Sequence, residues 1–481
     1  MKCIDFDNPI SSSWVERYWR RLSSKPYLSG AIEARILLDK LPAQKEPLHK
    51  LTAGYFGGIY NGPQFVRNYV DSKEHGVPFL TSGTMLLADF SRVGHLRKKD
   101  AFSSKLSYLR LKEGMTLITC SGTIGRMVYA GQYIDNMWSS QDILKVIPNP
   151  DKILPGYLYA YLSSRFGKPL VAEGTYGQII QHIEPQHIAD LPVPIAQLEI
   201  QKKAHELITE MAQLRVEGVA GYQQATEQIF NSIGIVEPQR HTWLSDKTGE
   251  AFSVTQLSSK TLRALNYDPR YIQLCLDLKK HRHDKLGELC DPHHFGSGII
   301  FKRIDADPEF SVRLVGQREA FQVRPEGRWI SRKSIEGLGL IVPQGTTIIA
   351  AHGTLGETEL YCRSTYVTER TSTYAFSGDF VRCIPLEDKV LPGYLFAFLR
   401  SEVAFRILRN ISVGSKQQAH HPELLWNIPV PRLDEKQEKE IHKLVEASAK
   451  KLDQALQLEE EAWYLVEDWI MEGARWQKSS Q

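Results

Sequence analysis

The chain has 481 residues, which is too long for one ordinary hydrophobic core, so two or more domains are expected. Hydrophobic residues make up 42% and charged residues 24%, as in soluble globular proteins, and no apolar run approaches the roughly 20 residues that cross a bilayer. The net charge of +3 neither requires nor excludes a nucleic-acid partner, because local basic patches matter more than the sum.

The first part of the chain, residues 1–194, is expected to form a mixed domain behind a short N-terminal lead. Residues 53–145 alternate short β-prone runs with turns that contain Gly and Ser, which predicts strands. Residues 154–166 are expected to form a helix, because Pro155 suits a first helical turn. The domain ends at Leu191-Pro-Val-Pro194.

The period of the apolar residues changes after this Pro-Val-Pro motif, and residues 195–235 are expected to form a long helix. Apolar side chains there recur in steps of four and three, which is typical of a coiled-coil seam. The same steps reach Gly218 and Gly221. These glycines either weaken the helix or allow another helix to approach closely.

The second part of the chain repeats the first. Leu154-Pro-Gly-Tyr-Leu158 returns as Leu391-Pro-Gly-Tyr-Leu395, and the Pro-Val-Pro motif returns at Ile428-Pro-Val-Pro431, both 237 residues later (391 − 154 and 428 − 191). Ser121-Gly-Thr-Ile-Gly125 corresponds to His352-Gly-Thr-Leu-Gly356, where the offset is 231 (353 − 122). Similar ends around a divergent middle indicate a constant frame that carries a variable surface.

These repeats predict an α+β fold built by tandem duplication. Two mixed α/β domains alternate with two long helices that are expected to form an antiparallel coiled coil, in a pseudo-two-fold arrangement. The remaining expected boundaries are 236–431 for the linker and second domain, 432–473 for the second helix and 474–481 for the tail.

The order of a mixed domain, a Pro-x-Pro motif and a helix, all duplicated, resembles the specificity subunit of type I restriction–modification enzymes. The residues that carry the resemblance are Leu191-Pro-Val-Pro-Ile-Ala-Gln-Leu-Glu-Ile-Gln201 and Ile428-Pro-Val-Pro-Arg-Leu-Asp-Glu-Lys-Gln437. Each short motif is weak alone, but the order, spacing and duplication together are specific.

The resemblance implies a non-catalytic, cytoplasmic subunit without a cofactor. Its two domains would each read half of a bipartite site on double-stranded DNA, and the paired helices would act as a ruler for the gap. It also implies docking of two adenine-N6 DNA methyltransferase subunits and, through the complex, of the endonuclease and translocase subunits. No membrane partner is implied.

Candidate DNA contacts are basic side chains for phosphates, and amide or hydroxyl side chains on loops for bases. In the first repeat they are Arg92, His95, Arg97, Lys98, Lys99, Thr123, Tyr176, Gln178 and Gln181. In the second repeat they are Arg328, Arg332, Lys333, Thr354, Ser415, Lys416, Gln417 and Gln418.

Other activities fit the sequence less well. No Asn/Asp-Pro-Pro-aromatic motif of an amino-methylating enzyme is present, and no Gly-Lys-Ser/Thr phosphate loop of an ATP-driven motor. A nuclease-like set, Asp379 with Glu387 and Lys389, is not kept in the first repeat, where Pro150 replaces the glutamate.

Two further alternatives remain. The histidines and cysteine between His281 and His294 suit zinc by type, but their spacing matches no standard site, so no metal is predicted. None of the six cysteines forms a C-x-x-C pair, which favours a reducing cytoplasm. The competing hypothesis from another class is a duplicated scaffold that binds proteins through its helices without reading DNA.

Overall fold

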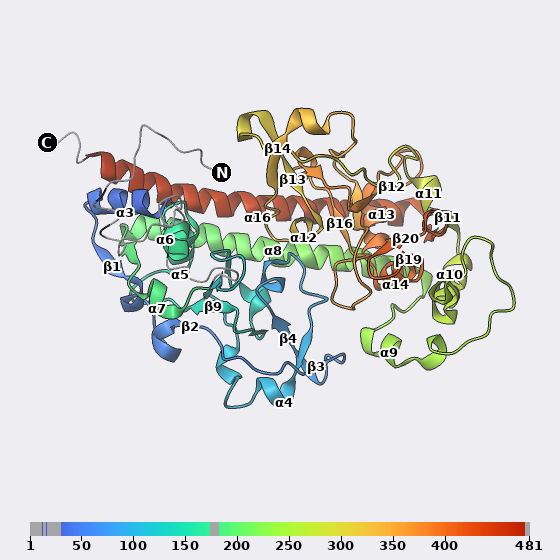
Figure 1. Cartoon of the computed structure of the whole chain (residues 1–481), viewed down its shortest axis with the longest axis horizontal. Helices are drawn as coiled ribbons and strands as arrows, with labels where there is room; N and C mark the ends of the chain where they lie inside the picture. Colours follow the sequence, from blue (N-terminus) through green and yellow to red (C-terminus); the bar gives the residue numbers. More distant parts are fainter. Residues whose placement is uncertain (1–11, 13–15, 17–29, 174–181, 477–481) are drawn as a thin grey trace. The chain divides into compact units, whose positions relative to one another are not determined.

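The computed structural model describes residues 12, 16, 30–173 and 182–476, which fold into two compact units (Figure 1). Unit 1 contains Met1–Leu86, Val93–Leu214 and Ala455–Gln481. Unit 2 contains Leu87–Arg92 and Arg215–Gln454. The chain therefore passes between the units at four places: on either side of the short segment Leu87–Arg92, and once within each of the two long helices.

Unit 1 holds two four-stranded sheets and one short strand pair. One sheet has the order β2-β9-β6-β7 and the other β3-β5-β4-β8, in which β4 and β8 run parallel. The strands are β1 (Lys45–Pro47), β2 (Ile59–Tyr60), β3 (Tyr69–Val70), β4 (Gly76–Leu80), β5 (His95–Arg97), β6 (Thr116–Thr119), β7 (Met127–Tyr129), β8 (Trp138–Ser139), β9 (Ile143–Val146) and β10 (Pro192–Pro194). The helices are α3 (Ala31–Lys40), α4 (Lys98–Ala101), α5 (Pro155–Ser163), α6 (Gly167–Glu173) and α7 (Pro185–Ala189).

Unit 2 repeats much of this arrangement, but its second sheet has three strands and it has a further short pair, β19-β20. Its sheets have the orders β12-β18-β15-β16 and β14-β13-β17, and β13 and β17 again run parallel. The strands are β11 (His283–Lys285), β12 (Gly296–Ser297), β13 (Ser311–Val315), β14 (Arg328–Ser331), β15 (Thr347–Ala350), β16 (Ser364–Tyr366), β17 (Ala375–Phe376), β18 (Phe380–Cys383), β19 (Ser412–Gly414), β20 (Gln418–His420) and β21 (Pro429–Pro431). The helices are α9 (Arg240–Ser245), α10 (Pro269–Lys279), α11 (Leu286–Leu289), α12 (Gln317–Ala320), α13 (Pro392–Leu399), α14 (Glu402–Asn410) and α15 (Pro422–Trp426).

The strand registers confirm the duplication that the sequence predicts. Thr116 of β6 lies opposite Val146 of β9, and Thr347 of β15 lies opposite Cys383 of β18. The two pairs are related by the offsets of 231 and 237 that the repeated motifs give. Each Pro-Val-Pro motif is itself a strand, since β10 pairs with β1 and β21 pairs with β11.

The repeated Leu-Pro-Gly-Tyr motif has the same structural role in both units. Its tyrosine hydroxyl donates to the last carbonyl of the Pro-Val-Pro strand, from Tyr157 to Pro194 at 2.7 Å and from Tyr394 to Pro431 at 2.6 Å. The glycine lies against the start of a long helix: a Cβ at Gly156 would be 2.7 Å from the Cα of His205. Through its tyrosine and glycine, the motif therefore joins the domain frame to the helix.

The two long helices are α8 (Leu198–Ile233) and α16 (Glu435–Trp476), drawn in green and red in Figure 1. Their 36 and 42 residues correspond to lengths of about 54 Å and about 63 Å. In unit 2, Gly218 lies against Leu452 and Gly221 lies against Ser448, so the residue numbers run in opposite directions. The expected antiparallel pairing is confirmed.

In unit 1 the same two helices enter the hydrophobic core with buried Ala204, Met211, Ala462 and Val466. The glycines of α8 therefore serve close approach, because side chains of α16 occupy the space that a Cβ would need. No helix among the residues that the structure describes is long and apolar enough to span a membrane.

Candidate nucleic-acid interface

Two pairs of basic residues occupy equivalent places in the two units. In unit 1, β5 ends at Arg97 and is followed directly by Lys98 and Lys99. In unit 2, β14 ends at Ser331 and is followed directly by Arg332 and Lys333. In unit 1, β5 pairs antiparallel with β4, which in turn pairs parallel with β8. In unit 2, β14 pairs antiparallel with β13, which in turn pairs parallel with β17.

The side chains of both basic pairs are exposed. Within the described ranges 30–173 and 182–476, no ion pair engages Lys98, Lys99, Arg332 or Lys333. Exposed cations at matching strand ends can contact phosphates without first giving up a carboxylate partner.

Arg97 and Arg328 differ from these four basic residues, because each already forms a bidentate contact with an aspartate. Arg97 donates to Asp100 from Nε at 3.1 Å and from Nη2 at 2.9 Å. Arg328 donates to Asp305 from Nη2 at 2.6 Å. The hydrogen bond from Arg97 lowers the pKa of Asp100. Exposed pairs of this kind contribute little stability, but a phosphate must displace the carboxylate to bind the same guanidinium.

A second set of candidate residues gathers around the Gly-Thr hairpins. In unit 2, Gly353 and Gln418 form a backbone bridge in which the amide of Gln418 donates to Gly353 at 2.8 Å. This bridge brings the exposed Thr354 loop beside the β19–β20 turn, where Ser415, Lys416 and Gln417 are exposed. The side chain of Gln418 is buried and donates to the carbonyl of Ser415.

Unit 1 shows the same kind of juxtaposition. Ser121, at the start of the first Gly-Thr hairpin, forms a backbone bridge with His182, and Thr123 is exposed at the tip of that hairpin. The predicted contacts Tyr176, Gln178 and Gln181 precede His182 and lie outside the described residues. In both units, therefore, the hairpin that follows β6 or β15 forms a backbone bridge with a residue beyond the helices, His182 or Gln418.

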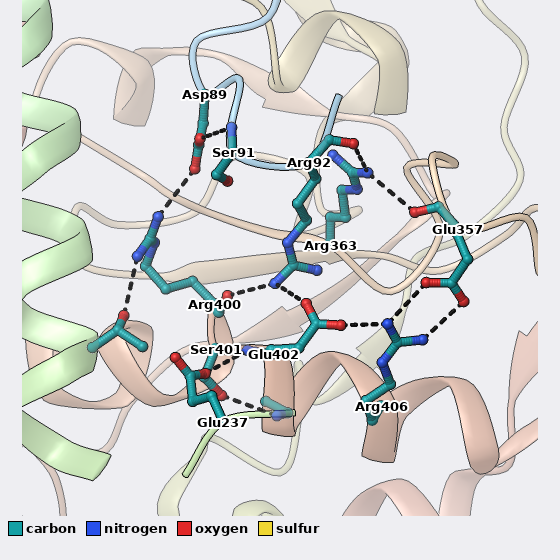
Figure 2. A network of polar contacts seen from close by, with 12 residues as sticks. Asp89, Ser91, Arg92, Glu237, Glu357, Arg363, Arg400, Ser401, Glu402 and Arg406 are labelled. Carbon is teal, nitrogen blue, oxygen red and sulfur yellow. Dashed lines mark hydrogen bonds and ion pairs between the residues drawn. The ribbon is translucent and has the colours of Figure 1, made fainter. Parts of the chain in front are cut away.

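Besides Gln418, two more of the predicted DNA contacts are held inside the protein. His95 lies on β5 and is buried, with 9% of its surface exposed. Arg92 donates to the carbonyl of Arg400 at 2.9 Å (Figure 2). Its guanidinium carbon also lies over the ring of Phe405, 4.4 Å from the ring centre. Burial withdraws His95 from the surface, and its contacts hold Arg92 within unit 2, so neither side chain belongs to the proposed interface.

Sequence reasoning missed a buried cation in each unit. Lys145 on β9 is fully buried and donates to the carbonyls of Ile143 at 2.9 Å and Ser140 at 3.4 Å. Burial lowers the pKa of Lys145 to about 7. The signal that could have found it is the offset of 237, which relates Lys145 to another basic residue, Arg382.

Arg382 on β18 is buried in the same setting. It donates to the carbonyls of Phe380 at 3.1 Å and Ser377 at 2.9 Å, which are 237 residues beyond Ile143 and Ser140. Each buried cation therefore stabilises a turn between two strands, Lys145 that between β8 and β9 and Arg382 that between β17 and β18.

The same turns account for the aspartates of the nuclease hypothesis. The hydroxyl of Ser140 accepts the backbone N–H of Asp142 at 3.2 Å, and that of Ser377 accepts the N–H of Asp379 at 3.4 Å. Such side-chain-to-backbone bonds stabilise turns. In the part of the chain that the structure describes, no three His, Cys, Asp or Glu side chains are grouped to hold a metal ion.

The comparisons with known proteins give one family match. Residues 57–217 match the model of the type I restriction modification DNA specificity domain. No curated protein matches the chain.

Several solved structures of low sequence identity align over most of the chain. A type I restriction–modification S subunit from M. genitalium is 13% identical, with 90% of this chain and 96% of that one covered and a TM-score of 0.32. An HsdS subunit from Thermoanaerobacter tengcongensis is 14% identical, with 90% and 97% covered and a TM-score of 0.27. A chain from a study of complex assembly and conformational transition of the type I R-M system is 12% identical, with 89% and 98% covered and a TM-score of 0.26.

The family model covers the sheets of unit 1 and the first part of α8. Unit 2 repeats the strand order of one four-stranded sheet, the parallel strand pair, the Tyr-to-Pro hydrogen bond and the close approach of a glycine to a long helix. Residues 57–217 therefore resemble a type I restriction modification DNA specificity domain, and unit 2 holds a structural copy of much of that region.

Proposed function

We propose that the chain recognises a bipartite site on double-stranded DNA, with one half-site read by each unit. The observation that carries this proposal is the recurrence of an exposed basic pair after equivalent strands, Lys98 and Lys99 in unit 1 and Arg332 and Lys333 in unit 2. Each pair supplies phosphate contacts that position a unit on the duplex, whereas side chains on neighbouring loops read base edges.

The loops proposed for base reading are the two Gly-Thr hairpins and the polar segments beside them. In unit 2 they present Thr354, Ser415, Lys416 and Gln417 together, a mixture of hydroxyl, amide and ammonium groups. In unit 1 they present Thr123, and the segment with Tyr176, Gln178 and Gln181 supplies the remainder. Because these loops differ between the units, the two half-sites differ as well.

The long helices hold the readers apart, so their length sets the unread gap. We further propose that two methyltransferase subunits dock on this chain in the cytoplasm and perform the adenine methylation. The endonuclease and translocase subunits join through that complex. The chain itself contributes recognition and no catalytic group.

The test is selection of binding sites from random duplexes, first with the purified chain and then with its co-expressed methyltransferase subunit. A split motif with one invariant gap is the expected result. Failure to enrich any motif, even with the partner present, would refute the proposal and favour a scaffold that binds only proteins. Binding by several phosphate contacts also requires that affinity fall steeply with the logarithm of salt concentration.

A further inference from the structure

The segment Leu87–Arg92, which we call the strap, lies between β4 and β5 of unit 1 in sequence but packs as part of unit 2. Its backbone is fixed by a bridge between Leu87 and Gln322 and by the N–H of Ala88, which donates to the carbonyl of Phe321 at 2.9 Å. The strap is thus an excursion of six residues from one sheet of unit 1 into the body of unit 2.

Two charged side chains anchor the strap (Figure 2). Asp89 pairs with Arg400, with 3.0 Å between Oδ2 and Nη2. Arg92 donates to the carbonyl of Arg400 and lies 3.5 Å from the carboxylate of Glu402. The N–H of Ser91 donates to Asp89 at 2.7 Å, which fixes the direction of that carboxylate.

The other end of Arg400 reaches the long helix α8. Its Nη1 atom donates to the carbonyl of Tyr222 at 3.0 Å and to the hydroxyl of Thr226 at 3.1 Å. Only 10% of the Arg400 side chain is exposed. One nearly buried guanidinium therefore joins the strap to α8, so a shift of the strap relative to that helix breaks charge-assisted hydrogen bonds.

The carboxylates beside the strap are committed to other partners in the same network. Glu402 pairs with Arg406 at 2.6 Å, and Arg406 also pairs with Glu357 at 2.8 Å. The Arg406 side chain is 2% exposed. The strap therefore packs against acidic and basic side chains that are paired with one another.

We propose that the strap is a positioning element that restricts the gap lengths accepted between the two half-sites. This inference rests on the proposed function. Apart from the strap, the chain passes between the units only within α8 and α16. Adding one base pair to a gap moves a half-site by about 3.4 Å along the duplex and about 34° around it. A second attachment, anchored to α8 through Arg400, resists such a displacement where the helices alone would tolerate it.

The test compares the unaltered chain with Asp89→Asn, which keeps the shape of the side chain and removes its charge, and with Arg92→Gln. Asp277→Asn is the matched control, because Asp277 also pairs with a cation in unit 2, Lys280 at 2.6 Å, but lies on α10. Affinity is measured for duplexes that carry both selected half-sites with the selected gap, and with gaps one and two base pairs longer or shorter.

The unaltered chain and Asp277→Asn should prefer the selected gap equally. In both strap variants, the ratio of affinity for the selected gap to affinity for other gaps should fall roughly tenfold, as expected for one lost hydrogen bond to a charged group. The half-site sequences and the affinity for random duplex should stay unchanged. Arg92→Lys, which keeps the charge near Glu402 but cannot stack on Phe405 in the same way, should give an intermediate preference.

A purely stabilising role would lower the melting temperature and leave the gap preference intact. An unchanged preference in both strap variants would overturn the strap inference and leave the proposed function standing. If the unaltered chain selected no split site at all, the proposed function would fall, and the strap inference with it.

Discussion

Replacement of Gly218 by alanine tests the close approach of the two long helices. An ideal Cβ at Gly218 would lie 2.7 Å from Cγ and 2.8 Å from Cδ2 of Leu452, and 3.1 Å from the carbonyl oxygen of Ser448. The carbonyl belongs to the backbone of α16 and cannot rotate away, so the helices must separate or Leu452 must leave its rotamer.

Two opposing effects set the magnitude. Alanine favours the helix over glycine by about 1 kcal/mol. Inserting a methyl group into a filled interface costs about 1–3 kcal/mol. We therefore expect Gly218→Ala to lower the free energy of unfolding by about 1 kcal/mol. At Gly221 the obstructing atom is the side-chain hydroxyl of Ser448, which can rotate at the expense of its 2.7 Å hydrogen bond to Leu444, so the loss there should be smaller.

The assay is urea unfolding followed by circular dichroism, with Ala220→Gly as the reference. Ala220 is exposed on the same helix, so its replacement measures the local helix preference alone. Adding Leu452→Ala to Gly218→Ala should recover part of the loss, because it removes the atoms that the new methyl group meets. If Gly218→Ala instead stabilised the protein as much as Ala220→Gly destabilised it, the argument for close approach would be refuted.

Three further outcomes are expected. Replacing Lys98 and Lys99 by alanine should lower the slope of log affinity against log salt by about 1.8 and weaken binding to all sequences alike. Adding Arg97→Ala should change the slope little, because Asp100 already neutralises that arginine. An unchanged slope in the double variant would remove Lys98 and Lys99 from the interface. Deleting one heptad from each long helix, about 10.5 Å, should shorten the selected gap by about three base pairs and keep both half-sites; altered half-sites would contradict the ruler. For Lys145, whose folded pKa of about 7 lies below its unfolded value of 10.5, the unfolded chain binds more protons between these pH values, so stability rises with pH there. Lys145→Met should abolish about 2 kcal/mol of rise between pH 7 and pH 9 in parallel unfolding curves, and identical pH dependence in both proteins would show that the ammonium group is not desolvated.

The frame of the fold could be predicted because its signals are local and occur twice. Leu-Pro-Gly-Tyr and Pro-Val-Pro recur at one offset, and the helix seam follows from the spacing of apolar residues. The two readings left open for Gly218 and Gly221 could be separated only by the partner helix. Leu452 and Ser448 lie more than two hundred positions away in sequence, and nothing in α8 itself identifies them.

The candidate interface was harder to predict, because charge alone does not tell where a side chain points. Arg92 and Lys98 belong to the same basic stretch, yet Arg92 stacks on Phe405 within unit 2 and Lys98 is exposed. Lys145 and Arg382 show the converse, since both carry a charged group and both are buried against carbonyls. These differences arise from contacts between distant segments, which no local pattern encodes.

The strap also bears on how such a chain can be recombined. The paired strands β1 and β10 bring the two ends of the first mixed domain together, so a chimaera could exchange the segment between them as a block. Such a chimaera would carry a foreign strap against the resident Arg400, Glu402 and Phe405. We therefore expect a working exchange only when the incoming strap can make the same contacts, or when Leu87–Arg92 of the resident chain is kept. The segment that must match the second domain therefore includes the six strap residues that precede it in sequence and pack as part of unit 2.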